Sequence, residues 1–312
     1  MAGPRISRAA KAKARQRLGS LKHQRVHEKT ANIYNAALAL FSAWLQCEQQ
    51  PLPQHESEMD PLACAYAEVL WQEGESKQDL ANLLSALEFE EGSLRYHLRC
   101  SWRLYGAWKK AEMQQQCTPM LAKWCRALAG AALARSWPEE AFLFLLAFDC
   151  LLRSVEAATL CPCNLEINEA ATMGSVCLSA SKGQTRSGIK EMVTISDRVL
   201  VRWAKALKEM KRPGDLLMVG GSKALRRKFK TCVEDIGLQD QNLQLYSLRR
   251  GGATEVFRSS GSFHEVADRG RWKNLKTARI YVDSALQDIA QLETAEHAKL
   301  KRAERRLAQL IF

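Results

Sequence analysis

At 312 residues the chain is long enough for two domains of ordinary size, each with its own core. Its hydrophobic fraction of 46% suits a folded soluble protein, and no apolar run reaches the roughly 18 residues that a membrane-spanning helix needs. The longest such run, residues 141–152, is already interrupted by Asp149. We therefore expect no membrane partner, and no secretion, because no apolar segment follows the basic N-terminus.

The ten cysteines are scattered, and the closest pair, Cys161 and Cys163, lacks the Cys-x-x-Cys spacing of many zinc and redox sites. The six histidines are scattered as well. This pattern predicts no disulfide framework, no structural metal, no cofactor and a reducing, intracellular location. In a eukaryote that location would be the nucleus; in a bacterium it would be the cytoplasm or nucleoid.

The net charge of +12 is placed unevenly along the chain. Residues 1–29 carry nine Lys or Arg and one Glu, a net charge of +8. Residues 182–230 carry fourteen basic and four acidic residues, a net charge of +10. The region between these patches is mildly acidic. Two separated basic patches indicate a polyanion that is bound at defined places.

The first 29 residues predict a flexible or induced-helix arm, which is either a solubilising tail or a nucleic-acid and nuclear-import arm. Helical periodicity follows, with Thr30 as the expected N-cap of a helix over 31–46 and further helices near 61–71, 76–89 and 94–113. The last of these places Arg95, Arg99 and Arg103 on one face. That face is either simply solvated or contacts DNA phosphates.

Polar residues 114–118 mark the expected domain boundary, and a helix over 119–135 comes next. Ser136 and Glu139 predict a capping box for a very apolar helix that runs toward Leu152 and forms the buried spine of the second domain. Arg153 and Glu156 follow directly. An arginine at the end of a buried helix requires an anion, and Glu156 is either that partner or only its orienting group.

Residues 174–181 and 189–195 predict a β-hairpin around a loop that contains Lys182 and Arg186, with Lys190 at the start of its second strand. Ser196 or Asp197 then caps the next helix. A strongly basic helix over 222–236 carries Arg226, Arg227 and Lys228. Further helices are expected over 247–260, after a capping box at 262–265, and around residue 281.

These elements predict a mainly α-helical protein with a small β-hairpin or sheet, an all-α domain preceding a mixed α+β domain. We expect an arm over 1–29, a helical domain over 30–115, a second domain over 116–290 and a C-terminal helix over 291–312. That last helix packs either on its own domain or on a neighbouring subunit.

The second domain contains, in order, Arg153, Glu156, a hairpin lysine at 182, and the segment from Tyr246 to Tyr281. LLRSVEAATL has an arginine three residues before an acidic one, YSLR places Arg249 three residues after Tyr246, and Trp272 stands nine residues before Tyr281. In this order and spacing the chain resembles the tyrosine recombinase (phage integrase) family over roughly 30–290. The resemblance implies a core-binding domain followed by a catalytic domain.

The resemblance implies a site-specific DNA recombinase or integrase that cleaves DNA through a 3′-phosphotyrosyl intermediate. Two permanently charged arginines, Arg153 and Arg249, suit the non-bridging oxygens of a phosphodiester, so that no metal ion is required. A covalent tyrosine intermediate would conserve the bond energy, so that ATP is not required either. Tyr281 would be the nucleophile and Lys182, or Lys190, the general acid. Trp272 would lie beside the phosphate. Arg250 stands next to Arg249, but the family spacing favours Arg249 as the active arginine. Four protomers on two double-stranded DNA sites would form the working assembly.

Tyr246 departs from the family pattern, which usually has histidine at that position. A phenol with its ordinary pKa of about 10 is a poor general base near neutral pH, although it can donate to a phosphate. This departure predicts a divergent, mobile-element-derived branch. It also favours an alternative, a catalytically impaired DNA-binding protein descended from a recombinase; a topoisomerase-IB-like enzyme that nicks and reseals one strand is a third reading. Target sequence, direction of recombination and host are not encoded in these motifs.

Overall fold

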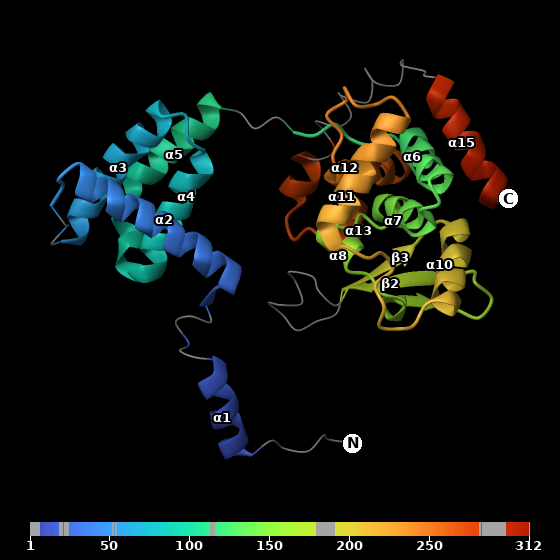
Figure 1. The fold of residues 1–312 in the computed structure, drawn as a ribbon, viewed down its shortest axis with the longest axis horizontal. Coiled ribbons are helices and arrows are strands. Elements are labelled where there is room, and N and C mark those ends of the chain that lie inside the picture. Colours follow the sequence, from blue (N-terminus) through green and yellow to red (C-terminus); the bar gives the residue numbers. More distant parts are fainter. Residues whose placement is uncertain are drawn as a thin grey trace. The chain divides into compact units, whose positions relative to one another are not determined.

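The structure, a computed structural model, describes residues 7–18, 21, 25–51, 53, 55–112, 116–178, 191–280, 282 and 298–311 (Figure 1). The chain divides into two compact units, residues 1–115 and 116–312, which are considered separately. Among the described residues no helix has both the length and the apolar content to cross a membrane.

The first unit is entirely helical. Its elements are α1 (Arg8–Leu18), α2 (Glu28–Cys47), α3 (Glu56–Gln72), α4 (Lys77–Glu90), the 3-10 helix η2 (Gly92–Tyr96) and α5 (Arg99–Ala111). Helices α2 to α5 enclose one core, in which Leu80, Leu84 and Leu98 are fully buried. The predicted all-α character is confirmed.

Three helices in this unit differ from the sequence prediction at their boundaries. Helix α3 begins at Glu56, five residues before the expected start near 61, so that Pro61 lies inside it. Helix α2 begins at Glu28 with His27 as its N-cap, so Thr30 lies inside the first turn and not before it. The single helix expected over 94–113 is divided, because η2 ends at Tyr96 and α5 begins at Arg99. Leu98, between them, turns into the core.

A carboxylate from α3 caps the start of α5. Asp60 accepts hydrogen bonds from the backbone N–H groups of Cys100 and Ser101, each at 2.9 Å, and from the Ser101 hydroxyl. The first N–H groups of a helix have no partner within the helix, so this carboxylate supplies one. Burial raises the pKa of Asp60, but the hydrogen bonds from Ser101 and Cys100 lower it by more, and the net pKa lies below its ordinary value.

We predict that Asp60→Asn lowers the free energy of unfolding of this unit by about 1–2 kcal/mol at neutral pH, because a charged acceptor at the helix start is lost. A carboxyl whose pKa falls on folding stabilises above its unfolded pKa, about 4, and that contribution disappears as the pH falls through the folded pKa. Hydrogen exchange of the α5 amides in the intact chain measures both effects. A difference between wild type and variant that persisted in strong acid would contradict this account.

The second unit combines helices with a small sheet. Its elements are α6 (Ala122–Ala134), α7 (Pro138–Asp149), α8 (Ser154–Ala158), η3 (Pro162–Asn164), β1 (Leu165–Ile167), β2 (Gly174–Leu178), β3 (Glu191–Ile195), α10 (Arg198–Met210), α11 (Gly221–Asp235), α12 (Leu245–Ser260), α13 (Phe263–Gly270) and α15 (Ala298–Ile311). Residues 275–280 and 282 are also helical. The predicted mixed α+β character is confirmed.

The sheet is antiparallel throughout, in the order β1-β2-β3. Val176 pairs with Leu165 on one side and with Val193 on the other, so the buried positions of the three strands coincide. The predicted hairpin strands are therefore present as β2 and β3. The sequence prediction missed β1, because three residues are too few to show an alternating pattern.

Helix α7 is the buried spine that its composition predicts, since Phe142, Phe144 and Leu146 are fully buried. Its expected capping box is absent. The helix begins at Pro138 with Trp137 as N-cap and no capping side chain, while Ser136 adopts a left-handed conformation with φ of 58°. Proline at the first helical position fixes the start without a capping hydroxyl.

Two consecutive glycines bring α12 against its neighbours (Figure 1). A Cβ on Gly251 would lie 1.9 Å from the carbonyl oxygen of Met120, and a Cβ on Gly252 would lie 2.1 Å from that of Phe148, near the end of α7. Only glycine permits such an approach. The helix that carries Arg249 is thereby held directly beside the end of α7.

We predict that Gly252→Ala destabilises the second unit by about 3 kcal/mol, because the new methyl group must displace backbone and not a flexible side chain. Gly214→Ala is the matched control, since its Cβ would meet no described atom within 4 Å. Urea denaturation of the intact chain, followed through hydrogen exchange of the α12 amides, makes the comparison. Equal stabilities of the two variants would show that the close approach is not a constraint.

Candidate active site

The site begins where the chain turns between α7 and α8. Leu151 is fully buried and adopts a left-handed conformation with φ of 49°, which is uncommon for a residue other than glycine. This turn directs the Leu151 carbonyl toward two arginines, since both Arg249 and Arg271 donate hydrogen bonds to it. Arg153 then takes an extended conformation as the N-cap of α8.

One buried carboxylate joins two of the arginines. Glu156, whose side chain is only 3% exposed, accepts the Arg153 guanidinium at 2.5 Å through Oε1. Its other oxygen, Oε2, accepts the Arg271 guanidinium and the backbone N–H of Arg153, both at 2.7 Å. The Arg153 side chain is 32% exposed. It is therefore more open to a ligand than Arg271 or Arg249, which are both almost completely buried.

Arg249 occupies the centre of the site. Its residue surface is 2% exposed, and its guanidinium donates to the carbonyls of Leu151 and Gly270, the latter at 2.5 Å. The same guanidinium lies over the Trp272 ring, 4.7 Å from the centroid, which is cation–π geometry. An arginine has five N–H donors, so these two hydrogen bonds fix its orientation without using its full capacity.

The neighbouring arginine points elsewhere. Arg250 is also 2% exposed, but its guanidinium donates to the carbonyl of Cys117, ahead of α6. Consecutive residues of a helix face directions about 100° apart, so only one of the pair can reach the α7–α8 turn. The structure therefore brings Arg249, and not Arg250, to Arg153 and Glu156.

The charges in this cluster are not balanced. Burial lowers the pKa of Arg249 to about 10, with further lowering by Arg271 and Arg153; Tyr246 and Glu156 act in the opposite direction. Burial also lowers the pKa of Arg271, which Glu156 partly offsets. Both groups stay protonated near neutral pH. Three guanidiniums face two carboxylates, Glu156 and Glu191, which leaves one excess positive charge that an incoming anion such as a phosphodiester would offset.

The Tyr246 phenol belongs to the same site. Tyr246 lies in the first turn of α12, three residues before Arg249 and therefore on the same side of the helix, and it is half-buried. Its phenol raises the pKa of Arg249, so it lies close to the cluster of Arg153, Arg249 and Arg271.

The sequence analysis did not single out Arg271. It follows Gly270 at the end of α13, adopts a left-handed conformation with φ of 56°, and has a side chain that is 8% exposed. A Cβ at Gly270 would lie 2.3 Å from the Trp272 ring, so glycine is required there for the ring to fold back. The only signal in the sequence was an additional arginine beside Trp272 in a basic turn.

Four of the predicted catalytic and DNA-binding residues, Lys182, Arg186, Lys190 and Tyr281, lie outside the described residues. Next to Lys190, Glu191 begins β3, and on either side of Tyr281 the described residues Ala278 and Val282 are both fully buried. Ala278, Val282 and Leu151 share one small core with Ala253 of α12 and with the partly buried Trp272. The helix that contains residues 275–280 is thus packed against the α7–α8 turn.

The predicted DNA-contacting residues fall into two groups. Arg95, Arg99 and Arg103 are all exposed, but only the last two share a helix, because Arg95 belongs to η2. On α11, Arg226 and Arg227 are exposed. Lys228 instead pairs with Glu140 at 2.5 Å and lies 4.9 Å from the centroid of the Trp137 ring.

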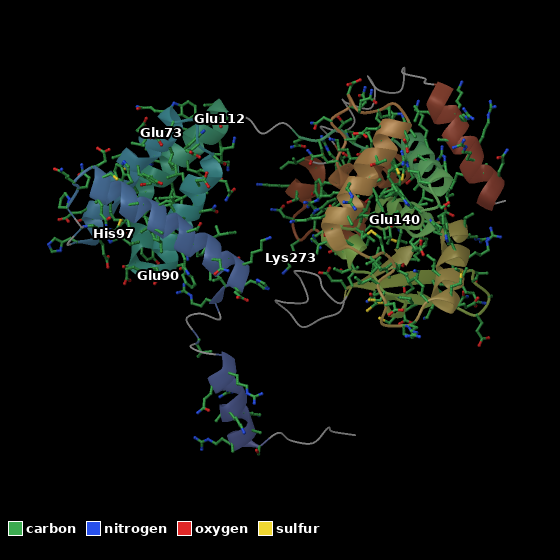
Figure 2. The ribbon with its side chains drawn as sticks, viewed as in Figure 1. Glu73, Glu90, His97, Glu112, Glu140 and Lys273 are labelled. Atoms are coloured by element: carbon green, nitrogen blue, oxygen red, sulfur yellow. The ribbon has the colours of Figure 1, made fainter. Side chains whose placement is uncertain are left out.

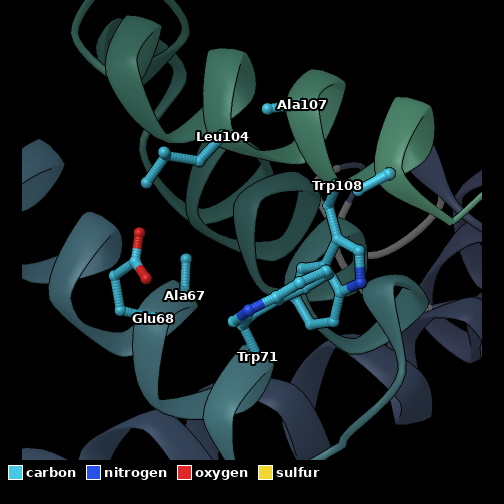
Figure 3. A pocket seen from close by; sticks show the side chains of 7 residues that line it. Ala67, Glu68, Trp71, Leu104, Ala107 and Trp108 are labelled. Atoms are coloured by element: carbon cyan, nitrogen blue, oxygen red, sulfur yellow. The ribbon is translucent and has the colours of Figure 1, made fainter.

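A shallow pocket also lies between α3 and α5 in the first unit (Figure 3). Trp71 and Trp108 meet edge to face at its wall, with ring centroids 5.3 Å apart. Its lining is otherwise mostly alanine and leucine, with Glu68 as the only titratable side chain. It therefore has none of the groups that the predicted chemistry needs.

No protein-family model matches this sequence, and no curated protein sequence is similar to it. Solved structures do match. The chain is similar to a XerH site-specific recombinase bound to a palindromic difH substrate in a post-cleavage complex, with a TM-score of 0.56 and 13% identity over 84% of this chain and 78% of that one.

It is equally similar to the Tn1549 transposon integrase in complex with transposon right-end DNA, with a TM-score of 0.56 and 12% identity over 90% of this chain and 98% of that one. At such low identities the likeness establishes the fold alone. The chain has the fold of the tyrosine recombinases and integrases, as the spacing of its motifs predicted.

We predict that Lys228→Ala lowers the free energy of unfolding of the second unit by about 3–5 kcal/mol, because it leaves the buried Glu140 carboxylate without its cation. Glu140 is labelled in Figure 2, and its side chain is 4% exposed. Arg227→Ala, one residue away and exposed, should change stability by less than about 0.5 kcal/mol. Urea denaturation gives both values. If the cause is the unpaired charge, Glu140→Leu added to Lys228→Ala restores stability; no recovery would refute it.

Proposed function

We propose that this protein cleaves and rejoins double-stranded DNA as a site-specific recombinase or integrase, through a 3′-phosphotyrosyl intermediate. The observation that carries the proposal is the cluster of Arg153, Arg249 and Arg271 around the Glu156 carboxylate. These residues come from two distant parts of the chain, the α7–α8 turn and the segment from α12 to the end of α13. A buried excess of positive charge with an open arginine at its edge suits a phosphodiester, which is anionic and presents two non-bridging oxygens.

Each group has a defined role in the proposed reaction. The Tyr281 oxygen attacks phosphorus as its phenolic proton passes to solvent, while Arg153 and Arg249 stabilise the charge that develops on the non-bridging oxygens. The bond to the 5′-oxygen breaks, and Lys182, or Lys190, gives that oxygen a proton. Attack by a 5′-hydroxyl on the phosphotyrosine then reverses these steps. The energy of the phosphodiester is conserved in the covalent link, so ATP is not needed, and the arginines supply the charge that a metal would otherwise provide.

Trp272 and Tyr246 complete the proposed site. The Trp272 ring holds the Arg249 guanidinium in place and can offer its N–H to the phosphate. Tyr246 can donate a hydrogen bond to the same phosphate from the first turn of α12. As a phenol it would not serve as the general base, so we assign it binding and not proton transfer.

The exposed arginines form the proposed DNA surface. We assign Arg99 and Arg103 of α5, with Arg95 beside them, and Arg226 and Arg227 of α11 to phosphate contacts, together with Arg186 and Lys190. Lys228 is left out, because Glu140 already holds it. Recombination would require a homo-tetramer on two DNA sites, which we propose as the active assembly.

One observation favours a second candidate function. Arg249 is 2% exposed and donates to two carbonyls, and tyrosine replaces the usual histidine at position 246. Both features suit a DNA-binding protein that has the recombinase fold and lacks strand cleavage. A topoisomerase-like enzyme would share the cleavage step but would not exchange strands between duplexes.

The deciding experiment uses a library of randomised duplexes, each with a nick that lets the cleaved end diffuse away. We predict a covalent protein–DNA adduct that survives detergent and is lost in Tyr281→Phe, because the phenolic oxygen forms the link. Tyr246→Phe is the matched control and should retain an adduct. Arg153→Ala should slow adduct formation at least about a hundredfold, since removal of one group that stabilises the transition-state charge costs about that much.

The other outcomes separate the candidates. DNA binding without an adduct from any member of the library would leave the non-catalytic DNA-binding protein. An adduct in Tyr281→Phe would show that the nucleophile is a different residue. Once the preferred sequence is recovered, recombination between two copies of it distinguishes a recombinase from a topoisomerase-like enzyme.

A further inference from the structure

Arg271 has an unfavourable backbone conformation, and nearly all of the hydrogen-bond donors of its side chain face an acceptor within the protein. Its backbone is left-handed, with φ of 56° and ψ of 42°, a conformation that is unfavourable for a residue other than glycine. Such a conformation persists only where contacts with the surrounding structure stabilise it. Here the stabilising contacts are made by the Arg271 side chain with three separate parts of the second unit.

The first contacts are with the α7–α8 turn. The Arg271 guanidinium donates to the carbonyls of Leu151 and Cys150, at 3.2 and 3.4 Å, and to Glu156 Oε2 at 2.7 Å. Leu151 is also the residue that receives Arg249, and Glu156 is also the partner of Arg153. Arg271 therefore binds the same two groups that orient both candidate phosphate-binding arginines.

The next contact is with the sheet. The Nε of Arg271 lies 3.4 Å from Glu191 Oε2, and Glu191 is the first residue of β3. An arginine at this position can span the distance because its planar group presents donors along two edges. The contact is an ion pair without a hydrogen bond, and through it the same side chain lies against both the start of β3 and the α7–α8 turn.

The backbone on each side of Arg271 carries two other groups of the site. The carbonyl of Gly270 accepts a hydrogen bond from Arg249 at 2.5 Å, and the ring of Trp272 lies 4.7 Å from the Arg249 guanidinium carbon. Any rotation of this turn would displace both the Gly270 carbonyl and the Trp272 ring from Arg249. Contacts that hold residue 271 in place therefore hold these two groups in place as well.

We propose that Arg271 is a positioning residue of the active site: it fixes the turn that carries Trp272, and the first residue of β3, against Glu156, without touching DNA itself. This inference rests on the proposed function for its catalytic consequence but not for its structural content. Each of the three guanidinium nitrogens of Arg271 is directed at a carbonyl or a carboxylate, so little of its hydrogen-bonding capacity is left for a ligand. Its excess charge still contributes to the field at the phosphate.

Arg271→Gly is the variant of choice, because glycine adopts the left-handed conformation without strain and the fold is retained. The first measurement is the fluorine NMR spectrum of the intact chain with fluorinated tryptophan, with the Trp272 resonance assigned from Trp272→Phe. We expect Arg271→Gly to move or broaden that resonance and to leave that of Trp124, buried in α6, unchanged. Lys273→Ala, an exposed charge in the same turn, should leave both unchanged (Figure 2).

The second measurement separates positioning from binding. At saturating DNA, Arg271→Gly should form the covalent adduct about a hundredfold more slowly, because a displacement of the reacting groups by about 1 Å costs that much. Its Kd for the same duplex should equal that of the wild type. A Kd that weakens while the rate at saturation stays constant would overturn the proposal, since Arg271 would then be a DNA contact.

Failure of the proposed function remains distinguishable from failure of this inference. If the wild type forms no adduct with any duplex, strand cleavage is refuted, and the fluorine spectrum alone decides the role of Arg271. A Trp272 resonance that is identical in wild type and Arg271→Gly would overturn the inference whatever the protein does with DNA.

Discussion

The ion pairing of one buried carboxylate is the constraint on which the rest of the site depends. Glu156 is 3% exposed on its side chain and divides its two oxygens between Arg153 and Arg271. A buried carboxylate must be paired, so its position determines where both guanidiniums lie. Even with Glu191 beside Arg271, two carboxylates cannot neutralise these two guanidiniums and Arg249 as well. The excess positive charge is the physical reason why this region suits a phosphodiester.

The site is assembled by close approach of backbones as well as by charge. Gly251 and Gly252 let α12 touch Met120 and Phe148, and that contact delivers Arg249 to the Leu151 carbonyl. Leu151 and Arg271 both adopt left-handed conformations, and each directs a polar group into the cluster. Strained residues of this kind persist where the surroundings determine them strongly, and they concentrate at functional sites.

Sequence periodicity predicted the elements well and their ends less well. The spacing of apolar residues gave the helical unit, the buried α7 and the β2–β3 hairpin, because each is long enough to show its period. The capping box at Ser136 and the single helix over 94–113 were wrong. In both places the side-chain pattern matched the predicted feature, but the packed structure adopts a different backbone conformation. Ser136 has a left-handed conformation, and Leu98 enters the core between η2 and α5. The DNA-binding role predicted for Lys228 depended on charge alone, which does not reveal the buried partner Glu140.

The sequence by itself determined the class of fold and the identity of most groups in the site, since arginine, tryptophan and tyrosine at those spacings follow from the chain alone. The spacing of the motif favoured Arg249 over Arg250, and the tertiary structure gives the physical reason: the phase of α12 against α7 directs Arg249 to the Leu151 carbonyl and Arg250 to that of Cys117. Only the tertiary structure revealed Arg271, whose importance lies in contacts with residues more than a hundred positions earlier in the chain. Local patterns encode periodicity and capping; contacts between distant segments depend on how the helices pack.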